Sequence, residues 1–326
     1  MIRFVGVSLT VLAIAGVCAP ATAAADGLPV GNVDAGPGGI ASRTGDVRYV
    51  TVPATPNTLA LSIRRNGGQV LHSKMLRGRY TVPVVALDGT ADGLSADGRT
   101  LVLIKPRPGF PRALTTFAII DAQRLRTREI VRLRGDFSYD AMSPDGGLVY
   151  LIQYTSRRDP TRYAVRGYDT RKNRLLPDPI IDPRAFGEEG MRGYPITRAT
   201  SPNGQWAYTL YDGAGKHPFV HALNTRDLTA ACIDLHSLMG RKDLMGLGLD
   251  VTRDGGELNV VDPRGRPLAV VDTQTLRVND VLSRQTGSSS GDGGVSPGLW
   301  LVGLAGVLSV GGFFVLKRRR SAVVPT

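Results

Sequence analysis

Short apolar runs alternate with tight turns along most of this chain, and the alternation repeats about every fifty residues. In each repeat a hydroxyl residue is followed by a glycine turn and then by a run of aliphatic and aromatic residues. These turns lie at 42–45, 95–98, 143–146, 201–204 and 252–255. A unit of this size cannot bury both of its faces alone, so the repeats predict one fold built from similar neighbouring units.

The apolar runs have the length and composition of β-strands, because they are β-branched, aromatic or aliphatic and are bounded by Gly and Pro. Strands after the glycine turns are predicted at 48–52, 101–104, 148–152, 206–210 and 258–261. Each repeat then contains a third strand, at 59–63, 117–120, 163–168, 219–223 and 268–271. The fourth strands are predicted at 70–76, 128–133, 175–181, 229–235 and 276–282. Four short antiparallel strands per repeat are typical of a β-propeller blade.

The repeats therefore predict an all-β domain over residues 36–283, a five-bladed β-propeller of four-stranded antiparallel blades. A six-bladed propeller is the alternative, although we recognise no sixth repeat in the sequence. Residues 26–35 are predicted to add a strand to the last blade and to close the ring. Closure is expected because an unpaired sheet edge favours aggregation.

Two motifs resemble those of known propeller families. The turn at 143–146 reads Ser-Pro-Asp-Gly and is followed by Tyr150, and the run at 271–275 reads Val-Asp-Thr-Gln-Thr and is followed by Val278. Both resemble the repeats of the YVTN-type and TolB-like β-propeller families, and the resemblance covers about residues 36–283. It implies the architecture but no single activity, because such propellers serve as scaffolds, lactonases and periplasmic partners. The first repeat departs most, since Arg43 and Thr44 replace Pro-Asp.

The first 25 residues have the pattern of a secretory signal peptide. Arg3 supplies the positive charge, residues 5–17 form a short apolar run, and small residues around 21–25 provide a cleavage site. Cys18 suggests a lipid anchor as an alternative, but Val17 stands where a lipobox requires a small residue. The sequence therefore predicts export of the rest of the chain.

The C-terminal end is predicted to anchor the protein in the cell membrane. Residues 284–298 form a Gly/Ser-rich linker, and residues 299–316 are uncharged and apolar, enough for a helix of roughly 27 Å. Residues 317–326 begin with four basic side chains, which the positive-inside rule places in the cytoplasm. We therefore predict a single-pass protein with an extracellular N-terminal domain; processing by a sortase is the alternative at this end.

Positive charge is concentrated on predicted loops. The whole chain has 40 Lys and Arg against 28 Asp and Glu, and without the signal peptide and the tail 35 basic residues remain, a net charge of +7. Loops at one end of a propeller gather on one face, where like charges attract anions. We therefore predict a basic ligand-binding face for an anionic cell-wall polymer or an acidic protein partner, and no nucleic acid. The predicted ligand-binding residues, between second and third strands, are Lys105, Arg107, Arg112, Arg157, Arg158, Lys216, Arg264 and Arg266.

No metal or cofactor site is predicted. His217 and His221 are four residues apart in a predicted strand, which separates them by roughly 13 Å, too far to bind one zinc ion together. Asp88, Asp92 and Asp97 lack the alternating spacing of a calcium loop and fit turn chemistry better.

A hydrolase or lactonase with a carboxylate-lined central channel is the alternative function. Asp88, Asp140 and Asp250 lie on or near predicted inner strands and could approach one another there. The spacing of these residues does not require it, so no catalytic residue is predicted. Cys232 is the only cysteine beyond the signal peptide, which excludes an internal disulfide in the exported part.

Overall fold

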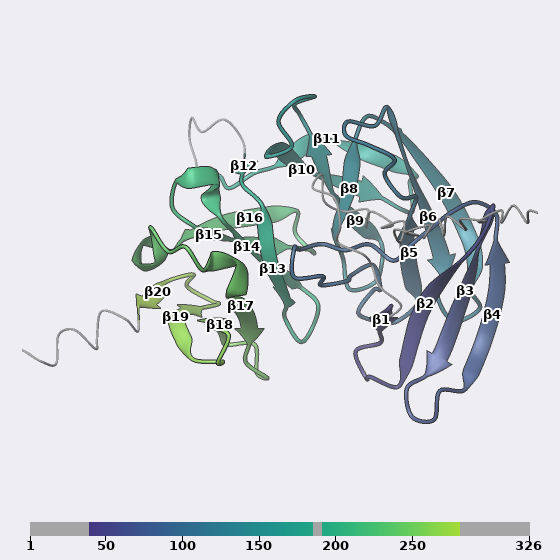
Figure 1. Ribbon diagram of the computed structural model, residues 1–326, viewed down its shortest axis with the longest axis horizontal. Helices are drawn as coiled ribbons and strands as arrows, with labels where there is room; N and C mark the ends of the chain where they lie inside the picture. Colours follow the sequence, from purple (N-terminus) through teal and green to yellow (C-terminus); the bar gives the residue numbers. More distant parts are fainter. Residues whose placement is uncertain (1–38, 185–190, 281–326) are drawn as a thin grey trace, which may run out of the picture. The chain divides into compact units, whose positions relative to one another are not determined.

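The computed structural model describes residues 39–184 and 191–280. They form five antiparallel sheets, each built from strands that follow one another in the sequence (Figure 1). The prediction of an all-β fold with four-stranded antiparallel sheets is thus confirmed. The predicted signal peptide, closing strand, linker, membrane helix and tail all lie outside the described residues. Within 39–184 and 191–280, no helix has the length and apolar character that a membrane crossing requires.

The sheets follow the predicted repeats closely. The first contains β1 (Ile40–Ala41), β2 (Val47–Ala54), β3 (Asn57–Arg64) and β4 (Val70–Leu76), and the second contains β5 (Thr100–Ile104), β6 (Leu114–Asp121) and β7 (Arg126–Arg134). The third contains β8 (Phe137–Met142), β9 (Leu148–Tyr154), β10 (Arg162–Asp169) and β11 (Arg174–Ile180), and the short β12 (Met191–Arg192) also pairs with β10. The fourth contains β13 (Pro195–Thr200), β14 (Trp206–Tyr211), β15 (Phe219–Asn224) and β16 (Thr229–Asp234). The fifth contains β17 (Gly248–Val251), β18 (Glu257–Val261), β19 (Pro267–Asp272) and β20 (Val278–Asp280), and short 3-10 turns lie in connections at η1 (Gly213–Gly215), η2 (His236–Leu238) and η3 (Leu244–Gly246).

The second sheet lacks a continuous first strand. Only isolated bridges, such as the one between Leu94 and Leu101, pair the segment before β5 with its neighbours. Gly93 interrupts this segment with a φ of +116°, and a Cβ there would lie 2.7 Å from the carbonyl oxygen of Val102. The close approach of the two backbones therefore replaces regular strand pairing at this point.

The repeated glycine turn has a common hydrogen-bond pattern, which the third sheet illustrates. The Ser143 hydroxyl donates to Asp145 Oδ1 (2.7 Å) and accepts from the Leu148 amide (2.9 Å). Gly146 has a φ of +70°, and a Cβ there would lie 2.5 Å from Thr100 Oγ1. The turn therefore requires glycine for its backbone conformation and for its contact with the preceding sheet.

Arg43, which breaks the motif in the first repeat, joins two of these turns. Its guanidinium donates to the carbonyl oxygens of Ser201 (2.9 Å) and Pro202 (2.8 Å) in the turn of the fourth sheet. The substitution of Pro by Arg in the first repeat thus forms a contact between repeats 158 residues apart.

Each hydrophobic core cluster joins two sheets that are consecutive in the chain. On β5, Leu101 and Leu103 belong to the cluster shared with the first sheet, whereas Val102 and Ile104 belong to the cluster shared with the third. Alternate residues of a strand point to opposite faces, so this sheet is buried on both faces. Two further clusters join the third sheet to the fourth and the fourth to the fifth.

The segment before β5 also reaches the fourth sheet. The amides of Leu87 and Asp88 donate to the carbonyl oxygens of Pro195 (2.9 Å) and Ile196 (3.1 Å) on β13. Val85, in the same segment, packs in the core cluster of the second and third sheets. This segment therefore contacts the third and fourth sheets, whose first strands carry the buried side chains Asp140 and Arg198.

Candidate functional site

Six of the eight predicted ligand-binding residues are exposed on loops between second and third strands. These loops lie at the same end of their sheets as the junctions that lead to the next sheet, because neighbouring strands run antiparallel. Arg266 forms an ion pair with Asp262 (2.6 Å), whereas the other five form no ion pair with a carboxylate in the part of the chain that the structure describes. The six residues are Lys105, Arg157, Arg158, Lys216, Arg264 and Arg266.

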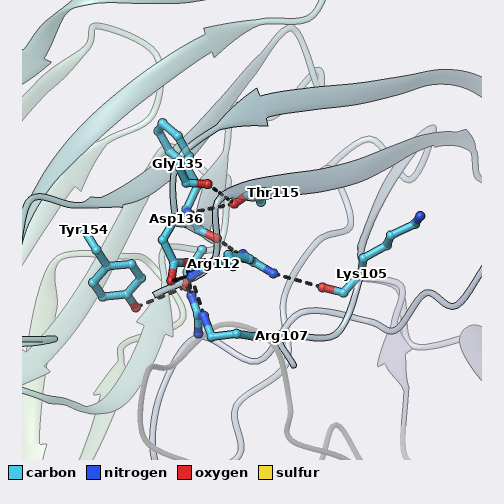
Figure 2. A network of polar contacts seen from close by, with 9 residues as sticks. Lys105, Arg107, Arg112, Thr115, Gly135, Asp136 and Tyr154 are labelled. Carbon is cyan, nitrogen blue, oxygen red and sulfur yellow. Dashed lines mark hydrogen bonds and ion pairs between the residues drawn. The ribbon is translucent and has the colours of Figure 1, made fainter. Parts of the chain in front are cut away.

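Arg107 and Arg112 are buried, with 7% and 9% of their surface exposed, which departs from the predicted solvent-facing basic surface. Figure 2 shows both guanidinium groups directed at Asp136, the residue just before β8. Arg107 Nη2 lies 2.7 Å and Arg112 Nε lies 3.2 Å from Asp136 Oδ1. Two cations thus share one buried carboxylate, and the loop that carries them folds inward to reach it.

Further contacts hold this loop against the third sheet. Arg107 donates to the Ser138 hydroxyl (3.0 Å) and lies 5.2 Å from the centre of the Tyr154 ring. Arg112 donates from Nη1 to the carbonyl oxygen of Lys105 (3.1 Å) and from Nη2 to that of Phe137. These groups therefore position the loop and expose the neighbouring Lys105 side chain (Figure 2).

Exposed basic side chains lie around Tyr80, between the first and second sheets. Lys105 Nζ lies 5.8 Å from the centre of the Tyr80 ring. The Lys105 amide donates to the carbonyl oxygen of Thr116 (3.0 Å). Thr116 on β6 is in turn paired with Arg132 on β7. Burial raises the pKa of Tyr80, and the positive charge of Arg132 opposes this rise. We define the Tyr80 basic patch as the exposed side chains Arg77, Arg79, Lys105 and Arg132, none of which forms an ion pair among the residues described.

Carboxylates accompany the basic residues on the other loops. Asp159 accepts hydrogen bonds from Thr161, and Asp212 accepts one from the Tyr194 amide (2.8 Å). Asp262 accepts from the Arg264 and Arg266 amides in addition to its ion pair. These carboxylates reduce the positive surplus of the other loops.

A buried polar cluster connects the first strands of the third and fourth sheets. Arg198 on β13 donates to the Asp140 carboxylate and to the Asp140 carbonyl oxygen (2.9 Å), and its Nε donates to Thr209 (2.6 Å). Asp92 lies 3.9 Å from the same guanidinium. Burial raises the pKa of Asp92, and the charge of Arg198 opposes this effect. We call Asp92, Asp140, Arg198 and Thr209 the inner cluster.

The carboxylates considered for a central channel have separate surroundings. Asp140 is in the inner cluster, where it shares Arg198 with Asp92. Asp88 is exposed and accepts two hydrogen bonds from Thr90. Asp250 is exposed on β17. Asp140 therefore shares the Arg198 guanidinium with Asp92, and not with Asp88 or Asp250. Asp92 was predicted to be a turn residue.

The two histidines that are four residues apart have different partners. His217 Nε2 lies 2.8 Å from Asp234, and the His217 ring lies 5.0 Å from that of His236. His221 is buried against Tyr211, and burial lowers the pKa of His221 to about 4. Within residues 39–184 and 191–280 no group of metal-ligating side chains fits a metal ion.

Sequence reasoning missed Asp136 and Arg198, whose partners lie 29 and 58 residues away. One signal was available for Arg198, which stands inside an otherwise uncharged run between Pro195 and Ala199. A charged residue within such a strand is buried only with a partner, so its position indicated a buried ion pair.

Comparison with known proteins gives similarity in structure only. No protein-family model matches the sequence, and no curated protein matches it. Hydrazine synthase of Kuenenia stuttgartiensis is 14% identical, with a TM-score of 0.46 over 80% of this chain and 68% of that one. The β-propeller domain of Cps50 (Swd1) from Myceliophteria thermophila is 12% identical, with a TM-score of 0.44 over 74% of this chain and 69% of that one.

TolB from Acinetobacter baumannii is 14% identical, with a TM-score of 0.40 over 72% of this chain and 52% of that one. The structural neighbours thus include TolB and a β-propeller domain. Identities and TM-scores this low carry no argument about what this chain binds or does.

Proposed function

We propose that this chain is an exported binding module, a five-bladed YVTN-type or TolB-like β-propeller tethered to the cell membrane through residues 299–316. Its ligand is an anionic cell-wall polymer, which it recognises through the basic loops at one end of its sheets. The consecutive four-stranded sheets support the blade arrangement. The export signal and the anchor rest on the sequence.

The Tyr80 basic patch is the observation that carries this proposal. Its four cations come from three separate elements: the junction after β4, the end of β5 and strand β7. Asp136, in the junction after β7, is already shared by Arg107 and Arg112. Because no carboxylate of the described residues pairs with the exposed cations, their field attracts anions, and arginine suits bidentate contact with phosphate or carboxylate. Arg157, Arg158, Lys216 and Arg264 extend the basic surface over the loops of the later sheets.

Neutralising part of the patch is expected to weaken binding to a polyanion. In the variant Arg77→Gln/Arg79→Gln/Lys105→Gln, affinity for immobilised poly(glycerol phosphate) should fall by roughly 3-fold to 100-fold, because each of the three exposed ion pairs contributes about 0.2–1 kcal/mol. Binding of the unmodified protein should also weaken as salt is raised from 50 to 300 mM, since screening reduces the attraction. Surface plasmon resonance across the salt series measures both effects.

A matched control has the same change in charge elsewhere. Arg65→Gln/Arg126→Gln/Arg253→Gln removes three exposed cations from turns at the opposite end of the sheets. It should bind poly(glycerol phosphate) almost as the unmodified protein does. Equal losses in the two triple variants would show a response to net charge alone and would reject the patch as the site. Binding of poly-L-glutamate in preference to the phosphate polymer would assign the site to an acidic protein instead.

Membrane attachment gives a separate prediction. Removing residues 287–326 deletes the predicted span and its basic tail, so the truncated protein should move from the membrane fraction to the soluble fraction. The full chain should stay with the membrane in high salt and leave it only in detergent, because the expected association is hydrophobic. Immunoblots of the fractions test this, and a full chain released by salt alone would contradict it.

A further inference from the structure

A small cavity lies beside the inner cluster, between the third and fourth sheets. Its volume is about 20 Å³, large enough for one group the size of a water molecule. Five of its eleven lining residues are tyrosines, and one of them, Tyr194, is half-buried. The wall includes Tyr139, Asp140, Tyr154, Tyr163, Tyr194 and Tyr211.

Asp140 brings an unsatisfied acceptor to this cavity. Only 3% of the residue is exposed, and its Oδ1 accepts from Arg198. Its Oδ2 is buried and has no hydrogen-bond partner within residues 39–184 and 191–280. A buried carboxylate oxygen without a partner costs free energy, so this atom favours a ligand that donates to it.

The unpartnered oxygen belongs to a carboxylate, so a positively charged donor suits it better than a neutral one. Asp140 and Asp92 both face the Arg198 guanidinium, and the charge of Arg43 also acts on Asp92. His221 adds no charge here at neutral pH, because burial lowers its pKa to about 4.

The tyrosine rings add to this preference. Tyr154, Tyr163 and Tyr211 form a continuous series, with ring centres 6.3 Å and 5.8 Å apart. The faces of such rings carry partial negative charge and attract ammonium groups. The Tyr163 hydroxyl donates to the carbonyl oxygen of Gly193 (3.3 Å), which supplies polar atoms in the same wall.

From these observations we propose that the cavity is a binding site for a primary ammonium group, with Asp140 Oδ2 as its acceptor and the tyrosines as its walls. An ammonium head matches the cavity in size and supplies charged donors for the unpartnered carboxylate oxygen. A free alkylamine and a lysine side chain share this chemistry, and in both the alkyl chain would leave past Tyr194. The site is distinct from the Tyr80 basic patch and prefers the opposite charge.

Calorimetric titration with n-butylamine at neutral pH tests this proposal, with n-butanol as the uncharged control of similar shape. We expect saturable binding of the amine, no binding of the alcohol, and a loss of at least about tenfold in Asp140→Asn. Titration with Nα-acetyl-lysine amide, whose only amine is on its side chain, separates the two sources. Tighter binding of this compound would identify a lysine of a partner protein as the ligand, and tighter binding of butylamine a free amine.

Asp140→Asn leaves Arg198 with less compensation and could unfold the domain, so a second variant is needed. Asp140→Asn/Arg198→Gln removes both charges together and should retain the fold while it loses amine binding. Asp178→Asn, an exposed site on β11, should retain full binding. Absence of butylamine binding to the folded unmodified protein, equal binding of butanol, or undiminished binding to the folded double variant would overturn the proposal. Loss of poly(glycerol phosphate) binding would leave it untouched.

Discussion

Replacing Asp136 by Asn is expected to destabilise the domain of residues 39–280 by roughly 3–5 kcal/mol, because it removes a buried negative charge that two buried guanidinium groups contact. Arg107 and Arg112 are both buried and both lie within 3.2 Å of Asp136 Oδ1. Asparagine has almost the same shape, so the change in stability reports on charge rather than on packing. Urea unfolding of the protein, followed by circular dichroism, measures it.

The control for this experiment is Asp178→Asn, which neutralises an exposed carboxylate on β11. Its expected effect is within about 0.5 kcal/mol, as for most surface substitutions. If Asp136→Asn changed the stability as little as this control does, the buried ion pairs would not form in solution. The inward fold of the loop at 105–113 would then need another explanation.

The second large effect expected is a loss of stability as the pH falls from 6.5 to 4, caused by His221. Burial lowers the pKa of His221 to about 4, whereas an unfolded histidine titrates near 6.5. Between these values the unfolded chain binds a proton that the folded protein does not, so the free energy of unfolding falls as the pH falls. At 1.36 kcal/mol per pKa unit the contribution is about 3 kcal/mol, fully lost near pH 4.

His221→Asn should remove this part of the pH dependence, and unfolding in urea at pH 7 and pH 4.5 measures the difference. The exposed His72→Gln variant should keep the pH dependence of the unmodified protein. Carboxylates with a depressed pKa, such as Asp182 at about 2, lose their contribution mainly below pH 4 and so affect this range little. Burial raises the pKa of Asp92, which gives the opposite slope, so the comparison of variants isolates His221. An unchanged slope in His221→Asn would contradict the assignment.

Strands and turns were predictable because their signals are local. The run at 148–152 lies within β9, and Ser143, Asp145 and Gly146 of the preceding turn interact within five residues of one another. The start of the last strand, predicted at Leu276, was wrong. Leu276 has a φ of +57° and still belongs to the turn, so β20 begins at Val278.

The candidate site was predictable only in part. Exposed loop cations such as Lys105 and Arg157 could be named from the sequence, because a polar loop between two strands is normally solvated. Arg107 has the same type of loop position but is buried, and no residue within the loop indicates its burial. Arg107 is buried because it pairs with Asp136, which belongs to the junction after β7.

By itself the sequence determined the all-β class, the order of the strands and the turns between them, because strand alternation and glycine turns depend on residues close in the chain. The tertiary structure decided which charges are available to a ligand and which are used internally. Arg198 meets Asp140 across 58 residues, and their burial together creates both the ion pair and the unpartnered carboxylate oxygen. The strength of such a pair depends on distance and desolvation, and both arise only when separate sheets pack together.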